Sequence, residues 1–181
     1  MNALIHMATG LGIALTIADT TPVTHCGSLL RCTAGFATGI LVHALLDYAP
    51  HCYPVNSKID FIGSFVLLCL LVAATRRPYR LLIACCLTGA VFPDLTDLLP
   101  AILNKQLNWQ LPIPEHKLFP WHQPAYSGSI YTGPCGVSDL NIFMVLTAVV
   151  ATVLWKRTTC LSLFSLRFLY PGKKHCCSGK K

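Results

Sequence analysis

The chain has 181 residues, of which 54% are hydrophobic and only 12% are charged, and its mean hydropathy is +0.57. A typical soluble domain has about 25% charged residues, so this composition favours an integral membrane protein over a soluble globule. The net charge is +7, but the basic residues are few and stand at segment ends and in the tail. This argues against a nucleic-acid-binding protein, which needs a continuous basic surface.

Five apolar segments predict an all-α integral membrane bundle with about five transmembrane helices. Each segment is close to the roughly 20 residues needed to cross a bilayer, although the third and fifth are short. The first has no basic stretch before it and no clear cleavage site after it, so we expect a retained helix and not a signal peptide. The segments cover residues 3–19, 27–49, 59–75, 79–100 and 140–155.

The distribution of Lys and Arg predicts how this domain is oriented. Arg76, Arg77 and Arg80 stand between the third and fourth segments, and basic residues recur after the fifth. Because cytoplasmic loops carry the excess of Lys and Arg, we expect the N-terminus outside and the C-terminus in the cytoplasm. The predicted domains are a transmembrane region, 1–155, with an external loop at 101–138, and a basic cytoplasmic tail, 156–181.

Ionisable residues inside the first two apolar segments are candidates for function, because burying them in a membrane is costly. The first segment contains His6. The second contains "HALLDYAPH", in which His43, Asp47 and His51 recur every four residues and therefore lie on one helix face. His6 alone is also compatible with packing, and the role of His51, beyond Pro50, stays open.

Further candidates follow in the fourth segment and in the loop after it. The stretch "GAVFPDLTDLLP" places Asp94 and Asp97 on one helix face, and "PEHKLFPWHQ" supplies Glu115, His116 and His122. Asp97 is alternatively an interfacial residue, and the two loop histidines are alternatively exposed. In the predicted topology, the intramembrane His6, His43 and Asp94 all lie roughly 21–23 Å from the cytoplasmic face, so a common site is plausible.

Imidazoles and carboxylates together are the ligand set of zinc, or of manganese or iron where oxygen ligands dominate. A bound ion would generate a hydroxide near neutral pH, so the set predicts a hydrolase of an ester or phosphoester. Glu115 or Asp97 would be the catalytic general base. The predicted metal ligands are His6, His43, Asp47, Asp94, Asp97, His116 and His122.

Ten cysteines are scattered along the chain without a CxxC pair. Most are interpreted as small packing residues, since Cys32, Cys69 and the pair at 85–86 lie within apolar segments. Cys176 and Cys177 in the basic tail are either acylation sites or ordinary tail residues.

The combination of an early His in "ALIHMATGLGIAL", then "HALLDYAPH", "GAVFPDLTDLLP" and a His pair resembles the predicted membrane-bound metal-dependent hydrolases of bacteria, distant relatives of zinc-dependent phospholipase C. The resemblance covers residues 1–125. It departs from the family's usual pattern in three ways. The His-x-x-x-Asp helix comes before the Asp-x-x-Asp segment, Leu98 stands where a His often follows, and the spacing of His116 and His122 is one residue longer than usual. The resemblance implies metal-dependent hydrolysis in a bacterial inner membrane and names no substrate.

Three functional classes follow from these patterns. The first is a hydrolase with a site near the outer membrane surface, where a lipid or lipid-linked substrate would reach it from the bilayer. The second is a non-enzymatic membrane scaffold whose polar residues pair between helices. The third is a metal or proton transporter, although a transport site is expected near the membrane midplane with access to both sides.

Overall fold

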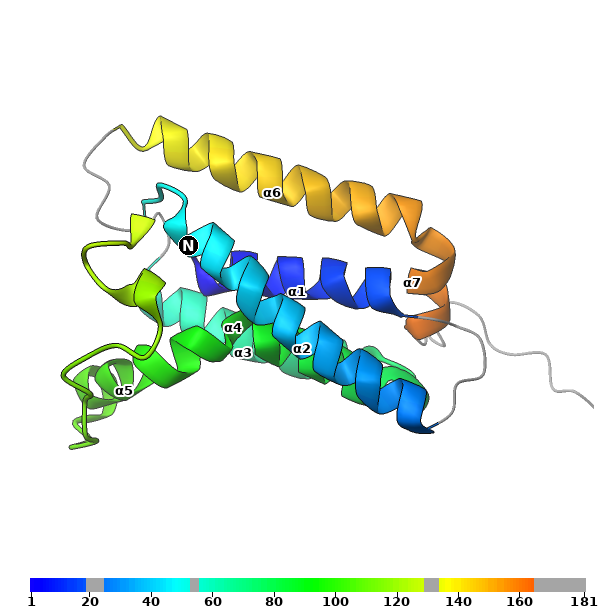
Figure 1. Ribbon diagram of the computed structural model, residues 1–181, viewed down its shortest axis with the longest axis horizontal. Helices are drawn as coiled ribbons and strands as arrows, with labels where there is room; N and C mark the ends of the chain where they lie inside the picture. The colour runs from blue at the N-terminus through cyan, green and yellow to red at the C-terminus, as the bar shows by residue number, and fades with distance from the viewer. Residues whose placement is uncertain (19–24, 53–55, 129–133, 165–181) are drawn as a thin grey trace, which may run out of the picture.

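The computed structural model describes residues 1–18, 25–52, 56–128 and 134–164, and these residues form helices and no β-strand (Figure 1). The all-α prediction is therefore confirmed. Two short helices and two 3-10 turns connect or follow the five long helices. The long helices are α1 (Ala3–Ile17), α2 (His25–Tyr48), α3 (Ser57–Ala74), α4 (Arg80–Asp97) and α6 (Gly136–Trp155); the others are α5 (Leu99–Leu107), α7 (Arg157–Leu163), η1 (Arg77–Tyr79) and η2 (Pro120–His122).

Three stretches of the described chain are long and apolar enough to cross a membrane, which is fewer than the five predicted. They are Ser28–Tyr48, Arg77–Asp97 and Gly136–Trp155. Helix α1 is also apolar, but its 15 residues extend only about 23 Å, less than the roughly 30 Å hydrocarbon core. Large apolar side chains cover the outside of the bundle, as a lipid environment requires; examples are Leu41, Leu45, Phe65, Leu70, Phe143 and Leu154.

Glycines bring α2 and α4 into close contact. A Cβ atom at Gly39 would lie 2.6 Å from the backbone nitrogen of Ala90, and one at Gly89 would lie 2.7 Å from Phe36 Cα. Neither distance is tolerated, so only glycine allows the two backbones to approach this closely. His43 is one turn beyond Gly39 and is therefore held directly against α4.

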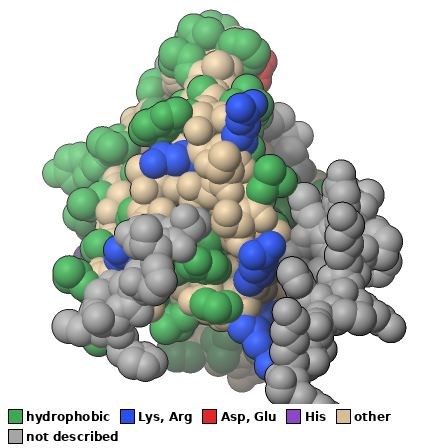
Figure 2. All heavy atoms as spheres, turned by 90° about the vertical axis from the view of Figure 1, so that its right-hand side faces the viewer, with side chains coloured by type: hydrophobic (Ala, Val, Ile, Leu, Met, Phe, Trp, Pro, Cys, Tyr) green, Lys and Arg blue, Asp and Glu red, His purple; other side chains and the backbone are tan. Residues whose placement is uncertain are grey.

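The two ends of the bundle differ in charge. The described Asp and Glu residues lie at the end where α1 begins and where α2 and α4 finish. Six of the nine described Lys and Arg residues gather at the opposite end, which faces the viewer in Figure 2, whereas Lys58, Lys105 and Lys117 lie at the acidic end. The six are Arg31, Arg76, Arg77, Arg80, Lys156 and Arg157.

The region predicted as a loop from residue 101 begins instead as a helix. Helix α5 starts at Leu99, with Pro100 in its first turn, and ends before Asn108, whose φ of 54° is left-handed. Proline suits a first helical turn and asparagine tolerates the left-handed conformation, so both boundaries follow from residue type. Helix α6 begins four residues before the predicted position 140. Of the predicted tail, Cys176 and Cys177 lie outside the described residues.

A disulfide that was not predicted joins Cys52 to Cys135, with the two Cα atoms 5.8 Å apart. Next to it, the backbone N–H of Cys52 donates to Ser138 Oγ (2.9 Å), and Asn141 Nδ2 donates to the Pro50 carbonyl (2.9 Å). These contacts attach the segment after α2 to the first turns of α6. Free cysteines of the described chain include Cys32, Cys69, Cys85, Cys86 and Cys160.

Candidate metal centre

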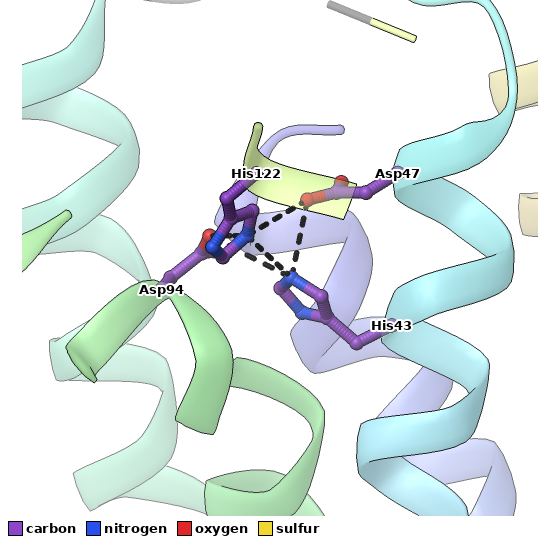
Figure 3. Close-up of side chains that lie close together, drawn as sticks. All are labelled: His43, Asp47, Asp94 and His122. Carbon is purple, nitrogen blue, oxygen red and sulfur yellow. Dashed lines mark hydrogen bonds and ion pairs between the residues drawn. The ribbon is translucent and has the colours of Figure 1, made fainter. Parts of the chain in front are cut away.

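Four ionisable side chains converge at the end of the bundle where α2 and α4 finish (Figure 3). Helix α2 provides His43 and Asp47, α4 provides Asp94, and the turn η2 provides His122. One potential ligand atom from each lies within 4.8 Å of all the others. These four residues, all predicted as ligands from the sequence, form a group that could hold a metal ion.

The five distances that involve a histidine lie between 3.2 and 3.6 Å. His43 Nε2 lies 3.3 Å from His122 Nε2, 3.2 Å from Asp47 Oδ2 and 3.6 Å from Asp94 Oδ1. His122 Nε2 lies 3.2 Å from Asp47 Oδ2 and 3.4 Å from Asp94 Oδ1. Four ligands arranged tetrahedrally at bond lengths of 2.0–2.1 Å would be about 3.3–3.4 Å apart. The five distances to or between the histidines are close to this value, while the whole group extends to 4.8 Å, so the four side chains could surround one ion.

A hydrogen bond on the far side of the ring orients His43. Its Nδ1 lies 2.7 Å from the carbonyl oxygen of Ala90 on α4. A carbonyl only accepts, so Nδ1 carries the proton and the lone pair of the neutral ring is on Nε2. That lone pair points at the other three side chains, as it does in a metal-ligating histidine supported by a backbone carbonyl.

Asp97 organises the loop that carries His122. Its carboxylate accepts the backbone N–H groups of Leu118 and Phe119, both at 2.9 Å, and it lies 3.0 Å from His122 Nδ1. Lys117 Nζ donates to the Asp97 carbonyl at 2.5 Å. Asp97 is buried and its carboxylate is fully engaged, so it supports His122 from behind and is not one of the four converging residues.

The carboxylates around His122 also affect its protonation. Burial lowers the pKa of His122, but the hydrogen bonds that it donates to Asp47, Asp94 and Asp97 outweigh burial and raise the pKa to about 9. In the imidazolium form, Nδ1 donates to Asp97 and Nε2 donates towards Asp47 and Asp94. A divalent cation would replace the proton on Nε2 and balance the same two carboxylates, Asp47 and Asp94.

His6 lies behind the group and holds the second oxygen of Asp47. Its ring stacks on His43, with the centroids 3.9 Å apart, and its Nε2 lies 3.1 Å from Asp47 Oδ1. The Met1 nitrogen also contacts this oxygen. His6 is fully buried, and its Nδ1 has no hydrogen-bond partner among the described residues. His6 is therefore next to the candidate ligand Asp47, but it is not one of the four converging residues.

Aromatic rings cover the group on the side of the loop. Trp121 lies 6.4 Å from His43 and 5.0 Å from Phe119, measured between ring centroids. Tyr48, at the end of α2, lies 6.2 Å from the same tryptophan. Such rings exclude water and so strengthen electrostatic interactions within the group. The contact of Trp121 with the metal centre could not be predicted from the sequence, because Trp121 stands in a loop and its spacing from α2 indicates nothing about their distance.

The remaining predicted site residues are not brought to the group. Glu115 and His116 are exposed in the loop, and neither has a hydrogen bond or ion pair with any described residue. His51 is buried, and its Nδ1 lies 2.8 Å from the Ala49 carbonyl, but it lies outside the four. A catalytic role for Glu115 and a ligand role for His116 therefore stay predictions.

No family model matches the chain, and no curated protein or solved structure was found to be similar to it.

Proposed function

We propose that this protein is a membrane-embedded, metal-dependent hydrolase acting on an ester or phosphoester. One observation carries the proposal: two imidazole Nε2 atoms converge with two carboxylate oxygens at nitrogen–nitrogen and nitrogen–oxygen distances of 3.2–3.6 Å, and each imidazole is held from behind by a hydrogen bond. Orienting contacts of this kind are typical of metal-ligating histidines. The resemblance to the bacterial membrane-bound hydrolases points to the same chemistry.

Zinc is the proposed metal, with manganese or iron as alternatives. Zinc accepts imidazole and carboxylate ligands with tetrahedral geometry, which the spacing of the four groups supports. Asp94 is the ligand with the longest distances to the histidines, and its side chain is 20% exposed, against 0–6% for the other three. We therefore expect His43, Asp47 and His122 to be the permanent ligands, with Asp94 beside the position where water and substrate enter.

The bound ion would lower the pKa of a water molecule to about 7. Asp94 is the best-placed general base for that water, because it is the carboxylate beside the open position. Asp97 accepts three N–H donors and has little capacity to take a proton. His6 and Asp97 would be positioning residues, acting on Asp47 and His122 respectively.

We further propose the predicted topology of five spans, with the metal centre near the outer face of a bacterial inner membrane. Two observations support this orientation. Six of the nine described Lys and Arg residues lie at the end opposite the centre, as expected for a cytoplasmic end (Figure 2). The disulfide Cys52–Cys135 lies at the end of the metal centre, and disulfides persist in oxidising compartments. The position of the centre at one end also favours a hydrolase over a transporter.

Metal analysis tests the proposal. The purified wild-type protein is expected to contain about one zinc ion per chain and to hydrolyse a chromogenic phosphodiester or carboxylic ester. His43→Ala should lose both the metal and the activity. Lys105→Ala is the control, since Lys105 is exposed in the last turn of α5 and is not a predicted site residue, and it should retain both. Equal metal content in wild type and His43→Ala would refute the metal centre, and zinc without any hydrolysis would refute the enzyme.

A further inference from the structure

Exposed apolar side chains gather at the end of helix α5, close to the metal-centre end of α4. Leu107, the last residue of α5, and Trp109 are each 52% exposed, and Ile113 is 50% exposed. Helix α5 packs mainly on α4 and forms the corner of the molecule where α4 finishes (Figure 1). Large apolar side chains grouped on a few neighbouring residues mark a contact with a membrane or with another protein.

The turn after α5 is a defined structure. Asn104 Nδ2 donates to the Leu111 carbonyl, and the Leu111 backbone N–H donates to Asn104 Oδ1, both at 2.8 Å. Between them, the left-handed Asn108 ends the helix and lets the chain reverse. We call residues 104–111 the α5 hairpin. Its side-chain clamp on the backbone fixes the turn while the two large apolar side chains at its tip stay exposed.

The place of this hairpin along the chain puts it at a membrane surface. The stretch Arg77–Asp97 is long and apolar enough to span a membrane, and α5 begins two residues after it ends. The nine residues of α5 extend only about 14 Å. Leu98 separates the two helices, and α5 is strongly foreshortened beside α4 in Figure 1, so it runs across the bundle axis and not away from the bilayer.

The residue types favour lipid over a protein partner. Trp is enriched at the level of the lipid headgroups, where its ring contacts hydrocarbon and its N–H stays in a polar layer. Leu107 supplies a purely apolar side chain next to Trp109, and Lys105, two residues before, is exposed and can reach phosphate or water. Apolar, aromatic and basic residues on one short segment are typical of elements that lie in the membrane interface.

We propose that the α5 hairpin is an interfacial anchor whose Leu107 and Trp109 insert among the lipids of the leaflet on the side of the metal centre. The inference rests on α4 crossing the membrane and is independent of metal binding and hydrolysis. The anchor would hold the end of α4, which carries Asp94 and Asp97, at the depth of the lipid headgroups.

Fluorescence quenching tests the anchor on the full-length protein in phosphatidylcholine nanodiscs. Trp121→Phe and Trp155→Phe leave Trp109 as the only tryptophan. Lipids brominated near the headgroup end of their acyl chains should quench its fluorescence about twofold or more, because an interfacial ring lies among these atoms. Iodide dissolved in the water should quench it much less.

A charge in the hairpin sharpens the test. In the same background, Leu107→Asp should reduce the quenching by lipid and increase the quenching by iodide. Ala125→Asp is the matched control, since Ala125 is exposed in the loop outside the hairpin, and it should change neither. Circular dichroism should show wild-type helix content for both variants.

Three results would overturn the inference. Quenching by iodide and not by lipid would mean that the hairpin lies in water. Quenching by neither would mean that protein, such as a second copy of the chain, covers Trp109. Equal effects of the two aspartate substitutions would mean that the hairpin is not inserted. None of these measurements depends on zinc, so a metal-free protein whose Trp109 is quenched by lipid would refute the proposed hydrolase and leave the anchor in place.

Discussion

His122 Nδ1 lies 3.0 Å from the Oδ2 atom of Asp97, and this contact turns the opposite nitrogen of the ring towards Asp47 and Asp94. The two residues are 25 positions apart and belong to a loop turn and a helix end. Asp97 also accepts two backbone N–H groups of the loop, so one carboxylate both shapes the loop and orients the histidine. A carboxylate behind a ligating imidazole makes it more basic and fixes its tautomer.

Asp97→Asn should therefore weaken zinc binding without removing a ligand. The asparagine amide group cannot accept from all three N–H donors, so His122 loses its fixed orientation. Loss of such a supporting partner typically reduces metal affinity about 10- to 100-fold. A titration against a competing chelator measures the change. Asp139→Asn, at an exposed position in the first turn of α6, is the control and should bind zinc as wild type does.

Zinc binding should release a proton at neutral pH. The pKa of His122 is raised to about 9, so below that pH its Nε2 carries a proton, which the metal displaces. Calorimetric titrations in buffers of different ionisation enthalpy should show release of about one proton at pH 7 and progressively less as the pH rises above about 9. Proton release that is absent at pH 7 would contradict this arrangement.

Gly39→Ala should destabilise the protein and lower its zinc content, although Gly39 is not in the metal centre. Its Cβ would meet the α4 backbone at 2.6 Å, so α2 and α4 must separate, and His43 moves away from Asp94. Overpacking of this kind costs about 1–3 kcal/mol. Thermal unfolding in detergent measures it. Gly136→Ala is the matched control, because a Cβ there meets nothing within 4 Å.

The proposed orientation predicts which cysteines react from outside the cell. In a Cys52→Ser variant the exposed Cys135 loses its partner and should react with a membrane-impermeant maleimide in intact cells. Cys160, in α7 at the basic end, should react only after the membrane is permeabilised. Mass spectrometry of the labelled peptides separates the two sites. Labelling of Cys160 and not of Cys135 in intact cells would reverse the orientation.

Much of the fold was predictable, because apolar segments and helix boundaries depend on local residue types. The five long helices lie at the predicted places, and His43 with Asp47 share the predicted helix face. The number of spans was less predictable, since three stretches meet the length and composition of a membrane span. Helix α5 was not predicted, since the prolines and tryptophans of residues 101–138 were interpreted as one long loop.

The disulfide was not predictable because the spacing of Cys52 and Cys135, 83 positions apart, contains no information about their distance in space. The same limit applies within the predicted ligand set. His6 and Asp97 were grouped with His43 and His122 because residue type alone does not separate a ligand from the residue that orients it. Their hydrogen bonds to Asp47 and His122 distinguish the two roles.

The sequence by itself determined that the chain is helical and apolar, which ionisable residues it carries, and which of them share a helix face. These are properties of composition and of a period of 3.6 residues. Only the tertiary structure decided which side chains meet. The close contact of α2 and α4 at Gly39 and Gly89 brings His43 to Asp94, and the carboxylate of Asp97 folds the loop so that His122 completes the group. Those distances depend on how the helices pack and how the loop closes, and neither can be predicted from a local sequence pattern.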